Sequence, residues 1–467
     1  MPLMEPAPIP ALSDLGALHF IGLGGAGMSG LASLYLDVGA TVSGCDQVDS
    51  AGLRALGARG VITAVGHDPA HLDGVDTVVV SSAIRADNAE LVEAARRRCR
   101  VLHRSLALAA LMDDQTVVAV AGSHGKTTTS AMTVASLRVA GADPSFVIGG
   151  NFTDSGQSAH RGGDRLFVVE ADESDGSFRQ YPTTVAVITG IEADHLDNWV
   201  SEAAYRAGFS QFASAAGVNC LVANGDDPAA AELARQMAAS GRMVRTYGQS
   251  AGCDLVVSAV DLSGPTATAR FDCDGWGQPI RLSLPGRHNL LNAAAAWLVG
   301  NQLGCDRSGL VEGLERFTGT ARRFQTVGQA GGVTVIDDYA HHPTEVAATI
   351  AAAREVAGAG RVIVAFQPHL FSRTRDFADA FGQALALADR SVVLDVYPAR
   401  EDPIPGVSGQ TVADAALRAG ANVDYVPRLA DLATAVGALT QPGDLVLTMG
   451  AGSITTAGPA ILARLAL

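Results

Sequence analysis

One stretch, residues 117–129, constrains the fold of this chain more than any other part of the sequence. It predicts an apolar strand, a short turn with two glycines, and then a helix whose first residues are Lys126 and Thr127. In such a turn the backbone N–H groups and the helix N-terminus converge on phosphate oxygens, the lysine neutralises charge, and the threonine hydroxyl binds Mg²⁺. Because Val120 stands where the strict G-x-x-x-x-G-K-[ST] pattern requires glycine, we interpret the loop as a compact variant.

This loop is predicted to hold a triphosphate. The alternative is an ordinary glycine turn before a helix with an exposed lysine, but the apolar strand and the Lys-Thr placement favour phosphate binding. The residues expected around the phosphates are Gly122, Ser123, His124, Gly125, Lys126, Thr127 and Thr128.

Length and composition exclude several classes of protein. A chain of 467 residues is too long for one hydrophobic core, so we expect about three domains. The net charge of −15 argues against non-specific binding to nucleic acid or to an acidic membrane, because both need a basic surface.

The six cysteines show neither a C-x-x-C pair nor a metal-ligand spacing, and we interpret them as reduced thiols in apolar cores. The sequence shows no secretory signal, and no apolar run approaches the ~20 residues that span a bilayer. We therefore expect a cytoplasmic protein that does not insert into membranes.

A second glycine-rich turn, residues 22–27, lies near the start of the chain. It follows an apolar strand expected over 18–21 and precedes a helix, and Asp46 stands at the end of the next expected strand. This pattern is typical of dinucleotide-binding domains, although the loop accommodates any diphosphate, so NAD and UDP both stay open as ligands. Ser81 and Ser82 follow a further strand, where they either contact a ligand or cap the next helix.

Two expected strands of the middle domain end in acidic turns, residues 170–175 and 192–197. Parallel strands that end beside a phosphate loop bring these carboxylates and His195 to one edge of the sheet. Because crowded carboxylates are costly without a cation, we predict a metal–nucleotide centre in which one of them binds Mg²⁺. The alternative is a pair of acidic turns that cap helices.

Further along the chain, short alternating segments between 255 and 284 predict an antiparallel part of the middle domain. Asn289 and Asn292 then lie one turn apart on one face of an alanine-rich helix, where their amides can bind a base. Residues 318–324 are interpreted as a hinge. The last third again alternates strands and helices, with a parallel sheet and polar residues at the strand ends.

These patterns predict an α/β fold throughout the chain. The middle domain is expected to be a P-loop-type ATPase domain with a mostly parallel sheet and a small antiparallel part. Both outer domains are expected to be Rossmann-like. The predicted domains cover residues 1–113, 114–319 and 320–467.

Eight segments, taken in order, resemble the Mur ligase family over nearly the whole chain. Each segment is a weak signal, but eight in this order are specific. They are residues 22–30, 122–129, 170–175, 192–195, 286–292, 322–324, 337–345 and 397–406.

The resemblance implies a reaction and its substrates. It implies an ATP-dependent ligase of peptidoglycan precursor synthesis, in the branch that joins L-alanine to the lactyl carboxylate of UDP-N-acetylmuramate through an acyl phosphate. It also implies ATP and Mg²⁺ as cofactors and UDP, rather than a nicotinamide, in the first domain. We expect a monomer or a homodimer.

The resemblance also implies roles for single residues. Catalytic positions match Lys126, Glu170, His195, Arg323 and Asp338. Metal-binding positions match Thr127, Glu170 and His195. Beyond the phosphate loop, ATP-binding positions match Asn289, Asn292, Arg323 and Asp338. Positions that bind the UDP substrate match Gly22, Gly24, Gly25, Gly27, Met28, Asp46, Ser81, Ser82, Arg104, Tyr339, His341, His369 and Arg373.

Three residues depart from the family pattern. Gly190 stands where family members commonly have asparagine, so an amide contact must come from elsewhere. Leu370 stands where an arginine often follows Gln-Pro-His, which leaves phosphate binding to Arg373 or Arg375. Phe209 takes the place of the carbamoylated lysine of later-acting ligases, and this absence fits the alanine-adding branch.

Three rival functions remain on the sequence alone. A recycling ligase that attaches an intact tripeptide shares the architecture, but its acidic motif typically has tyrosine where Ser174 stands here. An NAD-dependent oxidoreductase leaves the phosphate loop unexplained, and a non-catalytic regulator would bind ATP without releasing phosphate.

Overall fold

The computed structural model describes residues 3–195, 198–399 and 401–467. Asp197 of the second predicted acidic turn and Arg400 of the segment 397–406 lie outside the described residues. Within these ranges, no helix combines the length and the apolar character needed to cross a membrane.

The chain divides into two compact units. The first unit comprises Met1–Val256, Cys273–Gly275 and Asn292–Leu314. The second comprises Val257–Asp272, Trp276–Leu291 and Glu315–Leu467.

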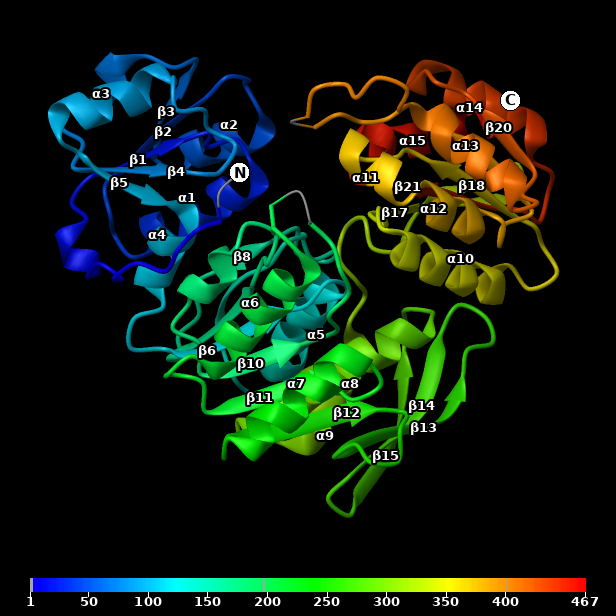
Figure 1. The fold of residues 1–467 in the computed structure, drawn as a ribbon, viewed down its shortest axis with the longest axis horizontal. Helices are drawn as coiled ribbons and strands as arrows, with labels where there is room; N and C mark the ends of the chain where they lie inside the picture. Colours follow the sequence, from blue (N-terminus) through cyan, green and yellow to red (C-terminus); the bar gives the residue numbers. More distant parts are fainter. Residues whose placement is uncertain (1–2, 196–197, 400) are drawn as a thin grey trace. The chain divides into compact units, whose positions relative to one another are not determined.

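The first sheet, drawn in blue in Figure 1, has five parallel strands in the order β3-β2-β1-β4-β5. The strands are β1 (Leu18–Ile21), β2 (Val42–Asp46), β3 (Ile62–Val65), β4 (Thr77–Val80) and β5 (Arg100–His103). The connecting helices are α1 (Ala26–Asp37), α2 (Ala51–Ala58), α3 (Ala89–Arg97) and α4 (Arg104–Leu111), with 3-10 turns η1 (Leu12–Asp14) and η2 (Pro69–Leu72). This strand order is that of a Rossmann-type half, so the predicted Rossmann-like domain is confirmed.

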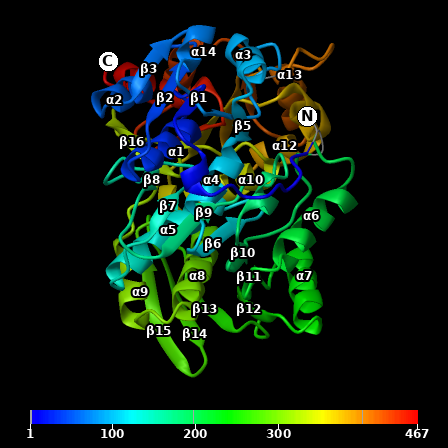
Figure 2. The ribbon, with the colours of Figure 1, turned by 90° about the vertical axis from the view of Figure 1, so that its left-hand side faces the viewer.

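The middle sheet has ten strands in the order β15-β14-β13-β12-β11-β10-β6-β9-β7-β8, and Figure 2 shows its central part from the side. The strands are β6 (Thr116–Ala121), β7 (Ser145–Val147), β8 (Ala159–His160), β9 (Leu166–Glu170), β10 (Val185–Ile188), β11 (Cys220–Asn224), β12 (Met243–Gly248), β13 (Leu255–Asp261), β14 (Ala267–Cys273) and β15 (Trp276–Leu282). The helices are α5 (Lys126–Val139), α6 (Glu202–Ser214), α7 (Pro228–Ala239), α8 (Arg287–Gln302) and α9 (Arg307–Arg316), with the 3-10 turn η3 (Ser177–Gln180).

Strand β6 lies between β9 and β10 and runs parallel to both. The register pairs Val120 with Glu170 and Ala121 with Ile188. All three strands therefore end at the same level, and the glycine turn and both acidic turns leave the sheet at one edge, as predicted. All three strands are apolar and almost wholly buried, as expected for a parallel sheet covered on both faces.

The antiparallel part of the middle sheet is confirmed at β14 and β15. Only Asp274 and Gly275 connect these neighbouring strands, and both have positive φ, 49° and 74°. Such a two-residue loop joins antiparallel strands as a hairpin.

The third sheet, in the second unit, has the order β16-β17-β21-β18-β19-β20. Its strands are β16 (Gln325–Ala330), β17 (Val333–Asp338), β18 (Val362–Phe366), β19 (Arg390–Val393), β20 (Val423–Tyr425) and β21 (Leu445–Met449). The helices are α10 (Pro343–Ala357), α11 (Phe371–Asp376), α12 (Ala378–Leu385), α13 (Gly409–Arg418), α14 (Leu429–Leu439) and α15 (Ala457–Leu465), with the 3-10 turn η4 (Ser453–Thr456). The predicted parallel sheet is confirmed for β17 to β20. The added edge strand β16 pairs antiparallel with β17 through the tight turn at Gly331 and Gly332.

Both faces of the third sheet are covered. Along β21, Leu447 and Met449 pack in the apolar cluster that includes α10, α12 and α13, while Val446 packs in the cluster that includes α14 and α15. Side chains alternate between the two faces, so this domain is doubly wound, as predicted.

Phe209 lies at the centre of an aromatic cluster in the first unit. Its side chain is fully buried and meets Phe178 and Tyr205 edge-on, with ring centroids 5.3 and 5.2 Å apart. A charged side chain here would have to lie among aromatic rings, so this position favours an apolar residue.

We expect Phe209→Ala to destabilise the fold by about 3–5 kcal/mol, because it leaves a cavity in this cluster. The measurement is urea unfolding followed by circular dichroism. Val200→Ala, at a side chain that is 94% exposed, is the matched control and should unfold like the parent protein. Equal unfolding midpoints for the two variants would contradict this account of the cluster.

Candidate active site

The glycine turn after β6 is shaped by close backbone approaches that only glycine permits. Gly122 and Gly125 have φ of 131° and 79°. A Cβ atom on Gly122 would lie 2.1 Å from Thr189 Oγ1, and one on Gly125 would lie 2.6 Å from Asn292 Oδ1. The turn ends at the N-terminus of α5, where backbone N–H groups bind anions.

Lys126, the first residue of α5, forms a buried ion pair with Glu173. Its Nζ lies 2.8 Å from Glu173 Oε2 and donates to the Gly122 carbonyl at 2.7 Å. Burial lowers the pKa of Lys126, but the carboxylates of Glu173 and Asp172 outweigh burial and raise it, so the ammonium keeps its charge. Lys126 is also the only lysine of the chain. Lysine and arginine together number 33, and all the others are arginines.

Thr127 and Glu170 place a hydroxyl and a carboxylate side by side. Thr127 Oγ1 donates to Glu170 Oε1 at 3.0 Å, and the Gly149 N–H donates to Glu170 Oε2 at 2.5 Å. A Cβ atom on Gly149 would lie 2.6 Å from both carboxylate oxygens, so this glycine makes room for the carboxylate. Hydroxyl and carboxylate oxygens are the donors that Mg²⁺ prefers, so these two residues fit the predicted metal site.

The second acidic turn is tied to the glycine turn. Ser123 Oγ donates to the Glu192 carbonyl at 2.7 Å, and the His124 Nε2 lies 2.8 Å from Glu192 Oε2. His195 has φ of 53°, and its Nε2 lies 3.5 Å from Asp194 Oδ2. The charge of His195 also lowers the pKa of Asp172, after Arg104 and Lys126, so the structure brings the two predicted acidic turns within electrostatic reach of each other.

Residues of the first domain reach the first acidic turn. Arg104 Nη2 lies 3.5 Å from Asp172 Oδ2, and a Cβ atom on Gly27 would lie 3.2 Å from Arg104 Nη1. Ser82 Oγ donates to Asp175 Oδ2 at 2.9 Å. Burial raises the pKa of Asp172, but Arg104 and Lys126 outweigh it and hold this pKa at about 2. Arg104 and Lys126 therefore supply part of the positive charge that the crowded carboxylates require.

The first glycine turn is held by the end of β2. Asp46 Oδ2 accepts from the Gly24 N–H at 2.9 Å, and its Oδ1 accepts from the Val48 N–H at 3.2 Å. Asp46 thus shapes the turn whose glycines are predicted to bind a diphosphate. The alternative that Ser81 and Ser82 cap the next helix was wrong, because α3 begins at Ala89 with Asn88 as its N-cap.

Asn289 and Asn292 contact different groups. Asn289 Nδ2 donates to the Pro285 carbonyl at 2.7 Å, whereas Asn292 Oδ1 accepts from Thr129 Oγ1 at 3.1 Å. Near Gly190, the amide of Asn224 donates to the Thr189 carbonyl at 3.0 Å. An amide thus lies beside the position where Gly190 departs from the family pattern.

In the second unit, the predicted residues gather at the end of β17. Burial raises the pKa of Asp338 to about 6, although the N–H groups of Phe324 and Ala340 donate to its carboxylate at 2.7 Å. The guanidinium of Arg323 lies 4.9 Å from the centre of the Tyr339 ring.

Two histidines and two arginines complete the predicted set of the second unit. The His341 ring lies edge-on to the rings of Tyr339 and His369, with centroids 5.2 and 6.0 Å away. Arg373 is only 5% exposed, whereas Arg375 lies 2.6 Å from Asp376 at the surface. The second unit therefore brings the predicted residues Tyr339, His341 and His369 together.

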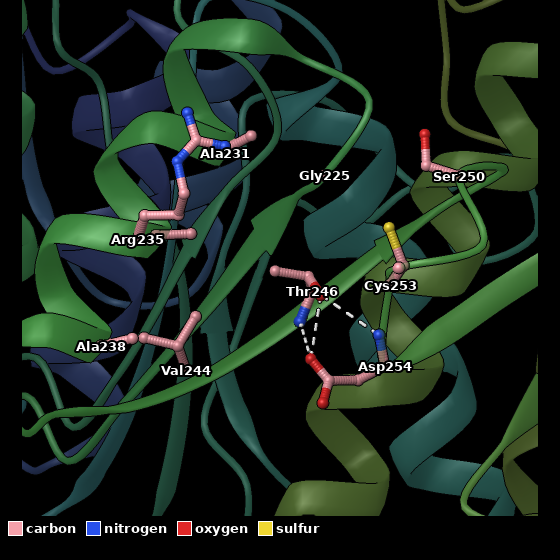
Figure 3. A pocket seen from close by; sticks show the side chains of 11 residues that line it. Gly225, Ala231, Arg235, Ala238, Val244, Thr246, Ser250, Cys253 and Asp254 are labelled. Atoms are coloured by element: carbon pink, nitrogen blue, oxygen red, sulfur yellow. Dashed lines mark hydrogen bonds between the residues drawn. The ribbon is translucent and has the colours of Figure 1, made fainter.

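A cavity of about 390 Å³ lies away from these residues, between α7 and the ends of β11 and β12 (Figure 3). Its polar groups are already engaged: Thr246 bonds Asp254 at 2.9 Å, and Arg235 pairs with Glu232 at 2.5 Å. Ligand sites present polar groups that converge on the ligand, so this cavity is not a candidate active site.

Models of three Mur ligase domains match the chain in order. Residues 17–116 match the model described as the Mur ligase family catalytic domain, residues 120–300 the middle domain, and residues 322–452 the glutamate ligase domain. This chain belongs to the Mur ligase family. The family predicted from eight short segments is thus confirmed.

Individual relatives indicate which branch of the Mur ligase family the chain resembles. The chain is 54% identical to the UDP-N-acetylmuramate–L-alanine ligase of Cutibacterium acnes, covering 100% of this chain and 99% of the relative. The UDP-N-acetylmuramate-alanine ligase structure from Thermotoga maritima matches with a TM-score of 0.81 and 27% identity, covering 96% of this chain and 98% of that one. The murein peptide ligase structure from Psychrobacter arcticus matches with a TM-score of 0.70 over 97% and 99%, and its 24% identity supports the fold alone.

Sequence reasoning missed the pairing of Lys126 with Glu173. The acidic turn was noticed, but its carboxylates were expected to serve a metal or to face water. The available signal was that both apolar strands end in a turn, and the register of β6 and β9 then places the residues just after Glu170 beside the glycine turn.

We expect Gly125→Ala to weaken ATP binding about tenfold or more, because the added Cβ would clash with Asn292 in the loop. Gly141→Ala is the matched control, since Gly141 also has positive φ, 95°, but has open space around it. Both variants pay about 1–2 kcal/mol for a left-handed alanine, and only the first changes the loop. Calorimetric titration with ATP separates them, and equal affinities would contradict the assignment of the loop.

Proposed function

We propose that this Mur ligase is an ATP-dependent enzyme that joins L-alanine to the lactyl carboxylate of UDP-N-acetylmuramate. The observation that carries the proposal is the glycine turn with Lys126, Thr127 and Glu170. The chain that contains it is similar over its full length to an alanine-adding ligase. A carboxylate does not react with amines near neutral pH, so the reaction needs an activating phosphoryl transfer.

The proposed reaction has two steps. The lactyl carboxylate attacks the γ-phosphorus of ATP, the bond to the β-phosphate oxygen breaks, and an acyl phosphate and ADP form. The amine of L-alanine then attacks the activated carbonyl, and phosphate leaves as the amide forms. Catalysis of such steps consists mainly of positioning and of stabilising charge.

Residues of the first unit are assigned roles in these steps. We assign the β- and γ-phosphates to the N–H groups of the glycine turn and to Lys126, and Mg²⁺ to Thr127 and Glu170 with His195 nearby. When bound, Mg²⁺ would neutralise phosphate charge. Arg104 lies between the Gly27 turn and Asp172, which supports a role in binding the UDP substrate.

The proposed roles of the second unit rest on the family pattern. Arg323 and Asp338 are proposed to contact ATP, and Tyr339, His341, His369 and Arg373 to contact the muramoyl substrate. Two features support such roles: the raised pKa of buried Asp338, and the group of three rings from Tyr339, His341 and His369.

We expect Lys126→Ala to lower alanine-dependent ADP release by about 100-fold or more, since an electrostatic stabiliser of the transition state is lost. Binding of UDP-N-acetylmuramate should stay close to that of the parent enzyme. Arg138→Ala, at the other end of α5, is the control and should remain active.

Because Lys126→Ala leaves Glu173 buried without its partner, this variant can lose stability. The double variant Lys126→Met/Glu173→Gln removes both charges and should fold while remaining inactive. Full turnover in the folded double variant would refute the role of the lysine.

The function is tested by measuring phosphate release from ATP and UDP-N-acetylmuramate with each single amino acid and with the stem tripeptide. We expect release with L-alanine. Release only with the tripeptide would indicate a recycling ligase instead, and release with neither would indicate a nucleotide-binding regulator.

A further inference from the structure

Four side chains with metal-binding atoms meet in the first domain. They come from four separate elements: His19 from β1, Cys45 from β2, His71 from η2 and Glu90 from α3. Their ligand atoms all lie within 4.8 Å of one another. Zinc bonds of about 2.0–2.3 Å place tetrahedral ligands roughly 3–4 Å apart, so the four atoms are close to the separations of one zinc site.

The cluster is buried in an apolar part of the domain. His19 is 1% exposed, and Cys45 and Glu90 are 0% exposed. Around them pack the apolar side chains of Ile21, Leu72, Val78 and Ala94. Polar and charged groups in such surroundings are costly unless they are paired or bind a metal.

Glu90 is the centre of the cluster. Cys45 Sγ lies 2.8 Å from Glu90 Oε2, and His71 Nδ1 lies 2.6 Å from Glu90 Oε1. His19 Nε2 lies 3.6 Å from Glu90 Oε2 and has no hydrogen-bond partner among the described residues.

His19 is oriented as a metal ligand usually is. Its other ring nitrogen, Nδ1, lies 2.9 Å from Ser43 Oγ, and this hydroxyl donates to the Leu18 carbonyl at 3.3 Å. Ligating histidines characteristically bond through the second nitrogen, which fixes the ring and aims the first nitrogen at the metal. A buried Nε2 that makes no hydrogen bond and lies 3.6 Å from a carboxylate oxygen is placed as a metal ligand would be.

We propose that His19, Cys45, His71 and Glu90 bind one Zn²⁺ ion. Two imidazoles, a thiolate and a carboxylate are a donor set that suits zinc, and Mg²⁺ or Ca²⁺ would need more oxygen ligands. Binding releases the thiol proton of Cys45 to solvent as the zinc–sulfur bond forms. The thiolate and the carboxylate then balance the charge of the ion, so the filled site is neutral in its apolar surroundings.

His67 and His71 provide a route to the site from solvent. Their side chains are 15% and 26% exposed, whereas the other ligands are buried. His67 Nδ1 lies 3.1 Å from Cys45 Sγ and 3.4 Å from Glu90 Oε2, so His67 can take the ion first and pass it inward.

The proposed zinc site supports the first glycine turn. The carbonyl of Cys45 accepts from the N–H groups of Gly22 and Leu23 at 2.9 and 2.8 Å. The next residue, Asp46, accepts from Gly24. Zinc at Cys45 would therefore stiffen the turn that we assign to the UDP substrate, although the site itself does not rest on the proposed function.

The test uses the full-length protein, stripped of metal under reducing conditions and then titrated with Zn²⁺ and Co²⁺ in excess Mg²⁺. Excess Mg²⁺ competes for oxygen-rich sites such as the pair of Thr127 and Glu170, so the nitrogen and sulfur site is the one expected to take the added ion. We expect one equivalent to bind, with release of protons, and a thiolate-to-cobalt charge-transfer band.

Two variants locate the site. Cys45→Ser should lose the charge-transfer band, because it removes the thiolate. Both Cys45→Ser and His71→Gln should weaken Zn²⁺ binding by more than about 100-fold, since loss of an outer-shell partner alone costs up to about that much. Cys99→Ser is the control, because this half-buried thiol packs against the same apolar cluster and bonds the Val75 carbonyl at 3.4 Å. Absence of the band in the parent protein, or its persistence in Cys45→Ser, would show instead a hydrogen-bonded network without a metal.

Discussion

The buried ion pair between Lys126 and Glu173 is the interaction on which the proposed phosphate site depends. A lone ammonium in this turn would be costly to bury, and Glu173 removes that cost while Lys126 also holds the Gly122 carbonyl. An incoming phosphate must therefore compete with a carboxylate for the lysine. A highly charged triphosphate competes better than a less charged ligand, so the pair favours ligands that bring several negative charges.

The acidic turn after β9 gives each carboxylate a different partner. Glu170 meets Thr127, Asp172 faces Arg104, Glu173 pairs with Lys126, and Asp175 accepts from Ser82. Two of these partners belong to the first domain and two to the middle domain. Six consecutive residues thus connect the turn that we assign to the UDP substrate with the loop that we assign to ATP, and charge bound at one changes the field at the other.

Most of the fold was predictable because its strands are apolar and end in glycine or acidic turns, as 117–129 and 166–175 do. The strands β7, β8, β12 and β16 were missed, since short or partly exposed strands carry weak patterns, and β8 and β16 lie at sheet edges. The partners of the site residues were also missed. Arg104 and Asp172 are far apart in sequence, and only the packing of α4 against the acidic turn brings them together. The zinc ligands escaped notice for the same reason, because four elements supply one residue each.

The single lysine of this chain has a practical consequence. Where other proteins have many ε-amines, this chain has one, on Lys126, at the loop that we assign to ATP. Protein grown with ¹⁵N-lysine should give one backbone amide signal in a two-dimensional spectrum, at a residue whose N–H belongs to the N-terminus of α5. Lys126 is likewise the one side-chain amine that an amine-directed reagent could modify, and its burial in the ion pair with Glu173 protects it. The arrangement makes the loop observable without any engineered label.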